Sequence, residues 1–167
     1  MGELKTIFQK KSFAYSGLIS VQGFYRAVMT WLTENKFNPY EEKHMEQVFE
    51  NGKEIVIEIK GDKKLSDYAE IKWKTKLVFT KLQEQVIEKD NQRVKMFKGS
   101  VKVSTDVFLV TDHDKTFEQS AFLFFLRTVI DRYVFKSYVN RAVARINGQY
   151  FKFQETLKSY LNMESFR

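Results

Sequence analysis

Cysteine is absent from this chain of 167 residues, and proline occurs only once, at Pro39. Without cysteine the chain forms no disulfides and offers no thiolate, a composition that suits a reducing compartment. One proline and seven glycines leave little material for flexible linkers, so we expect residues 1–167 to form a single domain. Hydrophobic residues make up 43% of the chain and charged residues 29%, which is typical of a globular protein.

A long hydrophobic run is missing as well. The longest, AFLFFL at Ala121–Leu126, is far shorter than the roughly 20 residues that span a bilayer as a helix. The N-terminal sequence MGELKTIFQKK lacks the apolar core of a signal peptide. We therefore expect a cytoplasmic protein without a transmembrane segment. Gly2 and Thr6 fit the myristoylation pattern, which is loose and matches many unmodified proteins.

The common catalytic motifs are also absent. There is no glycine-rich phosphate loop, no Gly-x-Ser-x-Gly elbow and no His-Glu-x-x-His helix. The segment Asp112–Asp114 (DHD) has metal-ligand side chains, but neighbouring positions rarely converge on one ion, and an aspartate that caps a helix explains it better. An acid–base pair of His44 and His113 would need both rings within hydrogen-bond range. We predict no catalytic residue, metal or cofactor, and nothing in these residues argues for an enzyme.

The N-terminal third of the chain predicts a strand followed by a helix. Scattered apolar residues favour a strand over Lys5–Ser16, and Ser20 can cap the helix that follows. Apolar residues recur there at helical spacing: Phe24, Tyr25, Val28, Met29, Trp31 and Leu32. Because Pro39 has no backbone N–H and restricts the residue before it, the helix must end ahead of it.

The middle of the chain alternates apolar and polar side chains. In AEIKWKTKLVF the residues that point one way are Ile71, Trp73, Thr75, Leu77 and Phe79. EIVIEIK and VKVSTDVFLV show the same period of two, whereas residues 40–50 are ambiguous. Turns are predicted at Asn51–Lys53, Gly61–Lys64 and Lys89–Gln92. This pattern is typical of antiparallel strands with one buried face, and we expect five to seven of them.

The C-terminal third predicts a long helix with two different halves. From Ala121 to Phe135 apolar residues cover almost the whole circumference, as in a helix enclosed by protein. Beyond this point they keep to one stripe: Phe135, Val139, Ala142, Ile146, Tyr150, Phe153, Leu157 and Leu161. We expect the sheet to grip residues 117–147, a break at Asn147-Gly148, and an amphipathic helical tail over residues 148–162.

The order of strand, helix, antiparallel strands and long C-terminal helix resembles the helix-grip fold of the START-like (SRPBCC) superfamily. The resemblance covers most of the chain but is one of element order, without a signature motif, and the tail after Gly148 departs from the usual single terminal helix. It implies an α+β domain whose antiparallel sheet curves around the last helix. It also implies an apolar cavity between the sheet and that helix.

Aromatic residues make up 16% of the chain. Those predicted to line such a cavity are Trp31, Trp73, Phe79, Phe122, Phe125 and Tyr133. Pockets for small molecules are mostly apolar and aromatic, although the same side chains serve equally well as fillers of a closed core. The leading hypothesis is a non-enzymatic binding protein that holds an apolar or amphipathic small molecule or lipid between sheet and C-terminal helix.

Basic side chains indicate a second hypothesis. The chain has 28 basic and 21 acidic residues, a net charge of +7, which favours nucleic acid, anionic membranes or acidic proteins unless it only reflects a lysine-rich composition. The candidates for contact with an anionic partner are Lys72, Lys74, Lys76, Lys95, Lys102, Arg141 and Arg145. The first three project from one strand face at steps of about 6.5–7 Å. The alternative function is therefore a basic RNA- or ribosome-associated accessory protein, although a solvated sheet face explains the row equally simply, since RNA-binding sheets usually expose aromatic residues.

The stripe of apolar residues after Gly148 is expected to be buried against another surface. Leaving Tyr150, Phe153, Leu157 and Leu161 in water would forgo roughly 1.5–3 kcal/mol of burial free energy each. That surface can be this chain's own sheet, a second copy in a homodimer, or a membrane. Because the charges beside the stripe are mixed, we expect one of the first two.

Overall fold

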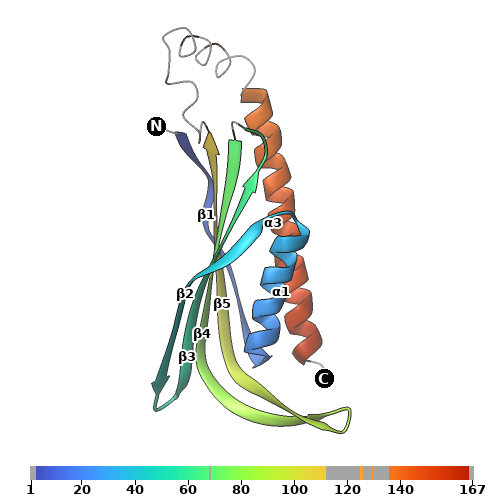
Figure 1. Cartoon of the computed structure of the whole chain (residues 1–167). Coiled ribbons are helices and arrows are strands. Elements are labelled where there is room, and N and C mark those ends of the chain that lie inside the picture. The colour runs from blue at the N-terminus through green and yellow to red at the C-terminus, as the bar shows by residue number, and fades with distance from the viewer. Residues whose placement is uncertain (1–2, 68, 112–124, 126–128, 130–135, 166–167) are drawn as a thin grey trace.

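The computed structural model describes residues 3–67, 69–111 and 136–165, together with residues 125 and 129 (Figure 1). Its elements, in chain order, are β1 (Glu3–Ile19), α1 (Val21–Glu34), β2 (Asn38–Phe49), β3 (Gly52–Lys64), β4 (Ala69–Lys89), β5 (Gln92–Thr111) and α3 (Lys136–Ser165). The five strands form one antiparallel sheet, and both helices lie on the same side of it. The predicted α+β class with an antiparallel sheet and a long C-terminal helix packed on it is confirmed.

The sheet has the order β1-β5-β4-β3-β2. Strands β2 to β5 form a meander of hairpins, and β1 joins it beside β5, so that β1 and β2 are the two edges. The far end of the β4–β5 hairpin curves beneath α1 and α3 (Figure 1). At its tip Asp90 and Asn91 both have positive φ, which suits a tight two-residue turn and agrees with the turn predicted at Lys89–Gln92.

Helix α1 begins and ends as its residues predict. The Ser20 hydroxyl accepts a hydrogen bond from the backbone N–H of Gly23 at 3.2 Å, which satisfies one of the amides that a helix start leaves free. The buried side is made of Phe24, Val28, Trp31 and Leu32. After the helix the chain turns, and Pro39 lies in the edge strand β2, where a missing N–H is tolerated.

The structure resolves one ambiguous segment and corrects one predicted turn. Residues 40–50 were ambiguous, and the structure places most of them in β2. The turn predicted at Gly61–Lys64 is wrong, because β3 continues to Lys64. Gly61 lies opposite Trp73 of β4, and a Cβ on it would stand 3.3 Å from the Cβ of Phe37. This glycine therefore makes room for aromatic side chains inside a strand, a use that its sequence neighbours do not reveal.

Helix α3 runs unbroken from Lys136 to Ser165, so the break predicted at Asn147-Gly148 is wrong. Nothing lies within 4 Å of a Cβ built on Gly148, which places this residue in the open. A glycine inside an exposed helix turn costs about 1 kcal/mol relative to alanine. Burial of the apolar residues on both sides of it outweighs that cost. No helix among the described residues is both long enough and apolar enough to cross a bilayer.

Within the described residues, helix α3 is covered along the apolar stripe that the sequence predicts. The stripe of α3 is buried against the rest of the chain at Val139, Ile146, Tyr150, Phe153, Leu157 and Leu161. Phe125 and Val129, from the half that we expected to be gripped, are 64% and 40% exposed. Apolar residues around a whole helix predict that the helix is buried, but they do not identify the element that buries it. Of the two covers expected for this stripe, the chain's own fold or a second copy, the structure shows the first for these residues.

Candidate functional site

Three of the aromatic residues predicted to line a cavity lie in a closed core. Trp31, Trp73 and Phe79 are buried. The rings of Trp31 and Trp73 are 5.4 Å apart between centroids, and that of Phe153 from α3 lies 5.4 Å from Trp73. The indole Nε1 of Trp73 donates a hydrogen bond to Thr75 Oγ1 at 2.9 Å, so its polar atom has a partner. These rings fill the layer between sheet and helices and line neither of the two clefts described below.

The other three predicted cavity residues come from the segment before α3. Phe125 is exposed, which corrects its assignment to a cavity wall. Phe122 and Tyr133 lie outside the described residues, as do Asp112–Asp114 and the histidine among them. The proposed His44/His113 pair therefore stays a prediction. No group of three or more metal-ligating side chains occurs in the described part of the chain.

A cleft of about 210 Å³ opens between the sheet and α3, and we call it the basic cleft. It is lined by Lys63, Leu65, Ile71, Tyr138, Arg141, Ala142, Arg145, Ile146 and Gln149. Lys63 and Ile71 come from the ends of β3 and β4 at their connecting turn. Arg141, Arg145 and Gln149 follow at intervals of four along α3, so their side chains stand one above the other on one side of the helix. The cleft thus joins an apolar floor to a row of cations.

Lys63 is the most constrained cation of the basic cleft. Its Nζ donates to the backbone carbonyl oxygen of Asn35 at 2.9 Å and lies 5.3 Å from the centre of the Phe37 ring. Burial lowers the pKa of this ammonium, and the positive charges of Arg145 and Lys36 lower the pKa further. The local field is therefore positive, and an anion bound here would relieve the repulsion.

The two arginines of the cleft have no acidic partner among the described residues. Arg141 donates only to its own helix, through Nε to the Ser137 carbonyl oxygen at 3.4 Å and through Nη2 to Ser137 Oγ at 3.5 Å. Neither Arg141, Arg145 nor Lys63 forms an ion pair with any described residue. None of the residues that line the cleft is acidic. Its positive charge is left without a protein counter-ion in the described part of the chain.

The seven basic residues predicted to meet an anionic partner fall on three surfaces. Lys72, Lys74, Lys76 and Lys102 lie on the sheet face turned away from the helices, Lys95 on the β4–β5 hairpin, and Arg141 and Arg145 at the basic cleft. The structure brings the two arginines together with Lys63, which the sequence had placed in a turn. No local pattern could have shown this, because Lys63 and α3 are distant in sequence and meet only in the folded chain.

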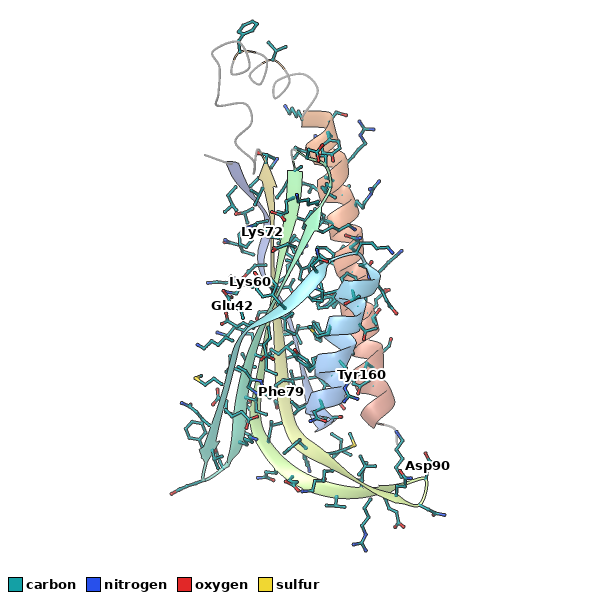
Figure 2. The ribbon with its side chains drawn as sticks, viewed as in Figure 1. Glu42, Lys60, Lys72, Phe79, Asp90 and Tyr160 are labelled. Atoms are coloured by element: carbon teal, nitrogen blue, oxygen red, sulfur yellow. The ribbon has the colours of Figure 1, made fainter. Side chains whose placement is uncertain are left out.

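The outer sheet face carries acids between its lysines. Lys74 and Lys76 both contact Glu58, at 3.1 and 3.5 Å. Glu42 forms an ion pair with Lys60 and lies 3.8 Å from Lys74. Figure 2 shows Glu42 and Lys60 on the side of the sheet away from α1 and α3. A hydrogen bond from Lys74 lowers the pKa of Glu58, so this carboxylate stays ionised and offsets the charge of both lysines.

Two of the three remaining predicted cations of the sheet also have an acid nearby. Lys72 lies opposite Asp62 in the β3–β4 register, and opposite positions in a sheet share a face. Lys95 forms an ion pair with Glu84 at 2.9 Å. Lys102 is exposed beside the buried core positions of β5. Instead of a continuous positive surface, the outer face is a mixture of both signs.

A second cleft, of about 300 Å³, lies between α1 and β2. It is lined by Val21, Gln22, Tyr25, Arg26, Glu41, His44 and Ile57. His44 stands between two carboxylates, 3.6 Å from Glu41 and 3.3 Å from Glu46. Burial and the neighbouring Glu41 raise the pKa of the Tyr25 hydroxyl. Because an arginine, a histidine and a carboxylate line this cleft and His44 already contacts Glu41, the cleft does not single out a class of ligand.

No family model, curated protein or solved structure matched the chain when each was compared with it.

Proposed function

We propose that this chain is a non-enzymatic binding protein that holds a small amphipathic anion in the basic cleft between the sheet and α3. The observation that carries the proposal is the pairing of an apolar floor with three cations that have no acidic partner in the described part of the chain. An oxyanion would lie against Lys63, Arg141 and Arg145, and its apolar part would rest on Ile71 and Ile146. Such a ligand supplies the counter-ion that the described protein groups do not.

The size and chemistry of the cleft narrow the ligand class. At about 210 Å³ it is smaller than the roughly 300–1,000 Å³ of pockets for drug-sized molecules, which favours a short apolar group with one anionic head. A guanidinium presents parallel N–H donors to a planar carboxylate or to a phosphate, so both heads suit Arg141 and Arg145. The resemblance to START-like proteins stays a prediction, and it agrees with the proposal in placing a ligand between sheet and final helix.

The alternative hypothesis of an RNA- or ribosome-associated protein has less support. It relied on the row Lys72, Lys74 and Lys76, two of which contact Glu58. Phosphate contacts need cations that are free to replace the counter-ions of the nucleic acid, and lysines held by carboxylates are poor at this. Aromatic residues that could stack on bases point inward from the same strand, as the burial of Trp73 and Phe79 illustrates.

Reversing the charge of Arg145 tests the proposed function. With octyl phosphate as probe, we expect Arg145→Glu to bind roughly tenfold to a hundredfold more weakly than the natural chain, because a charge-assisted hydrogen bond contributes about 1.5–3 kcal/mol. Isothermal titration calorimetry gives the affinities. The matched control is Lys152→Glu, which makes the same kind of charge change on an exposed position of α3 outside the cleft. Octanol and inorganic phosphate, each lacking one half of the probe, should bind far more weakly than octyl phosphate.

Equal binding of octyl phosphate by Arg145→Glu and the natural chain would contradict the proposal. Equal weakening by Lys152→Glu would show that overall charge matters and the cleft does not. The triple change of Lys72, Lys74 and Lys76 to Glu should leave octyl phosphate binding intact, since none of them lines the cleft.

The affinity for octyl phosphate should also fall as the pH rises towards 10.5, the ordinary pKa of lysine. Burial and two positive neighbours lower the pKa of Lys63, so this ammonium loses its proton earlier than an ordinary lysine would. The anion binds the charged form better, so affinity is full below the lowered pKa and decreases as the pH passes through it. The probe itself stays a dianion in this range, because phosphate monoesters complete their ionisation near pH 6.

The pH dependence is measured by repeating the titration at several alkaline pH values. Lys63→Arg is the informative variant, because a guanidinium keeps its charge over the whole range. We expect its affinity to change little where that of the natural chain declines. The same decline in both proteins would show that Lys63 does not contact the anion.

A further inference from the structure

Strand β2 forms one edge of the sheet, and no described strand pairs with its outer side. Eleven of its twelve residues are exposed, and only Pro39 is partly buried. The exposed positions include large apolar side chains, with Val48 82% and Phe49 50% accessible, and Met45 exposed as well. An edge strand presents a row of unpaired backbone N–H and C=O groups, which is a template for pairing with another strand. Apolar side chains add burial to that pairing.

The opposite edge of the sheet is protected, and this contrast is informative. Strand β1 changes register twice against β5, between Thr6 and Phe8 and again between Phe8 and Lys11, and Lys10 has a φ of 53°. Helix α3 also packs against β1. Bulges, edge lysines and covering helices are the usual means of preventing edge-to-edge association. In β2 a single irregularity, between Glu41 and Lys43, precedes a stretch that pairs with β3 in continuous register to its end.

We propose that residues 45–49 of β2 pair antiparallel with the same residues of a second copy of this chain, around a twofold axis at Gln47. The axis stands perpendicular to the sheet, so the two sheets join into one and the helices of both copies lie on the same side. In this register Met45 lies opposite the Phe49 of the second copy, and Glu46 opposite its Val48. The surface is separate from the basic cleft, so the proposal does not depend on the proposed function.

The residue at the twofold axis, called the centre here, fixes which residues of the two copies lie opposite each other. The charges of β2 distinguish the possible centres. A centre at Glu46 places that carboxylate opposite itself, and a centre at Val48 places Glu46 opposite Glu50. A centre at Lys43 places two ammonium groups together. Like charges directly opposite are unfavourable, so these registers are disfavoured. The centre at Gln47 avoids every such pair.

Two further positions of the axis are also disfavoured. A centre at His44 places Glu42 opposite Glu46, again two carboxylates. A centre at Met45 has no like charges, but its ladder crosses the irregularity at Glu41 and Lys43 on both copies. That irregularity bends the strand and interrupts regular pairing. With the twofold axis at Gln47, the paired residues all come from the part of β2 that follows the irregularity.

The side chains that meet around this axis are apolar on one face. Met45 lies opposite Val56 of β3, which in turn lies opposite Val78 of β4, so all three share the outer face of the sheet. Phe49 stands four positions from Met45 and hence on the same face. Pairing brings the Met45 and Phe49 of each copy together over these valines. Two exposed apolar side chains per chain would then become buried.

Single cysteines test the register cleanly, because the natural chain has none. Opposite residues of an antiparallel pair have Cα atoms about 4.5–5.5 Å apart, within the range that a disulfide bridges. Under mild oxidation we expect Gln47→Cys to form disulfide-linked dimers at least about tenfold faster than Thr30→Cys, an exposed control on α1, since pairing raises the effective concentration of the thiol. Non-reducing electrophoresis follows both reactions. Faster cross-linking of Met45→Cys than of Gln47→Cys would overturn the register.

Sedimentation equilibrium tests the association without a cross-link. The natural chain should reach twice the mass of one chain as its concentration is raised, whereas Phe49→Lys should remain a monomer with an unchanged circular dichroism spectrum. Val86→Lys is the matched control, because Val86, like Phe49, is an exposed apolar residue. It is 57% exposed and lies on β4 rather than on β2. This variant should dimerise like the natural chain. A natural chain that stays monomeric at every concentration would overturn the proposal. The exposed edge of β2 would then suit pairing with an extended segment of another protein.

Discussion

Replacing Phe153 with alanine is expected to lower the free energy of unfolding by about 3–5 kcal/mol, the range for large aromatic residues removed from a core. Phe153 is fully buried on α3, with its ring centroid 4.9 Å from that of Trp31 and 5.4 Å from that of Trp73. Both tryptophans are held by their own helix or strand, so they cannot move far into the space that the ring leaves. The cavity would therefore remain largely open, and its lining would lose contacts that water does not restore.

Urea denaturation followed by tryptophan fluorescence measures this loss directly, because both tryptophans border the site. Phe151→Ala is the control, since Phe151 lies two residues earlier on the same helix and is 58% exposed. Its ring contacts mainly the Lys11 ammonium, at 5.6 Å, and we expect a loss below about 1 kcal/mol. Similar losses for the two variants would show that α3 does not pack on the sheet through Phe153.

Ending the chain after Asn147 is expected to abolish folding. The deleted segment carries Tyr150, Phe153, Leu157 and Leu161, all buried in the structure. At roughly 1.5–3 kcal/mol each, their burial adds up to about the whole net stability of a domain, which is usually about 5–15 kcal/mol. The sheet and α1 would also expose the apolar surfaces that these residues cover. The truncated chain should show no cooperative thermal transition and should emit tryptophan fluorescence typical of water-exposed indoles.

A chain that ends after Asn162 is the control for this truncation, because it keeps every buried position of the stripe up to Leu161. It should unfold cooperatively, close to the temperature of the full chain. If the chain ending after Asn147 stayed soluble, monomeric and equally heat-stable, the stripe would not be covered by its own fold, contrary to the structure. Loss of liposome binding on the same truncation would then favour a membrane as the cover.

Much of the fold follows from patterns that depend on neighbouring residues. The alternation in β4 places Ile71, Trp73 and Phe79 on the buried face, because successive side chains of a strand point to opposite sides whatever the rest of the chain does. Ser20 caps α1 through an amide three residues away. The stripe of α3 follows from the 3.6-residue turn of a helix. Each of these features is decided within a few residues, so the amino-acid sequence reveals it.

The candidate site could be predicted only in part. Arg141 and Arg145 were recognised as cations on the polar side of a helix, but their association with Lys63 depends on where α3 crosses the end of β3. The predicted cavity residues Trp31 and Trp73 were correctly assigned to the interior. Whether the interior is hollow between them is a matter of side-chain packing, and their rings proved to be in contact. Composition cannot distinguish a lined cavity from a filled core, because both require the same residues.

The sequence by itself determined which face of each strand and helix is apolar, since that depends on local backbone geometry. The tertiary structure decided which of these apolar faces pack against each other. It placed Glu58 beside Lys74 and Lys76, and so turned a row of lysines into a mixed surface. It brought Lys63 and Arg145 near each other without an acidic partner among the described residues, which is the basis of the proposed anion site. The physical reason is distance: electrostatic interactions and packing depend on separation in space, and residues from distant parts of the chain become neighbours only when the strands and helices have assembled.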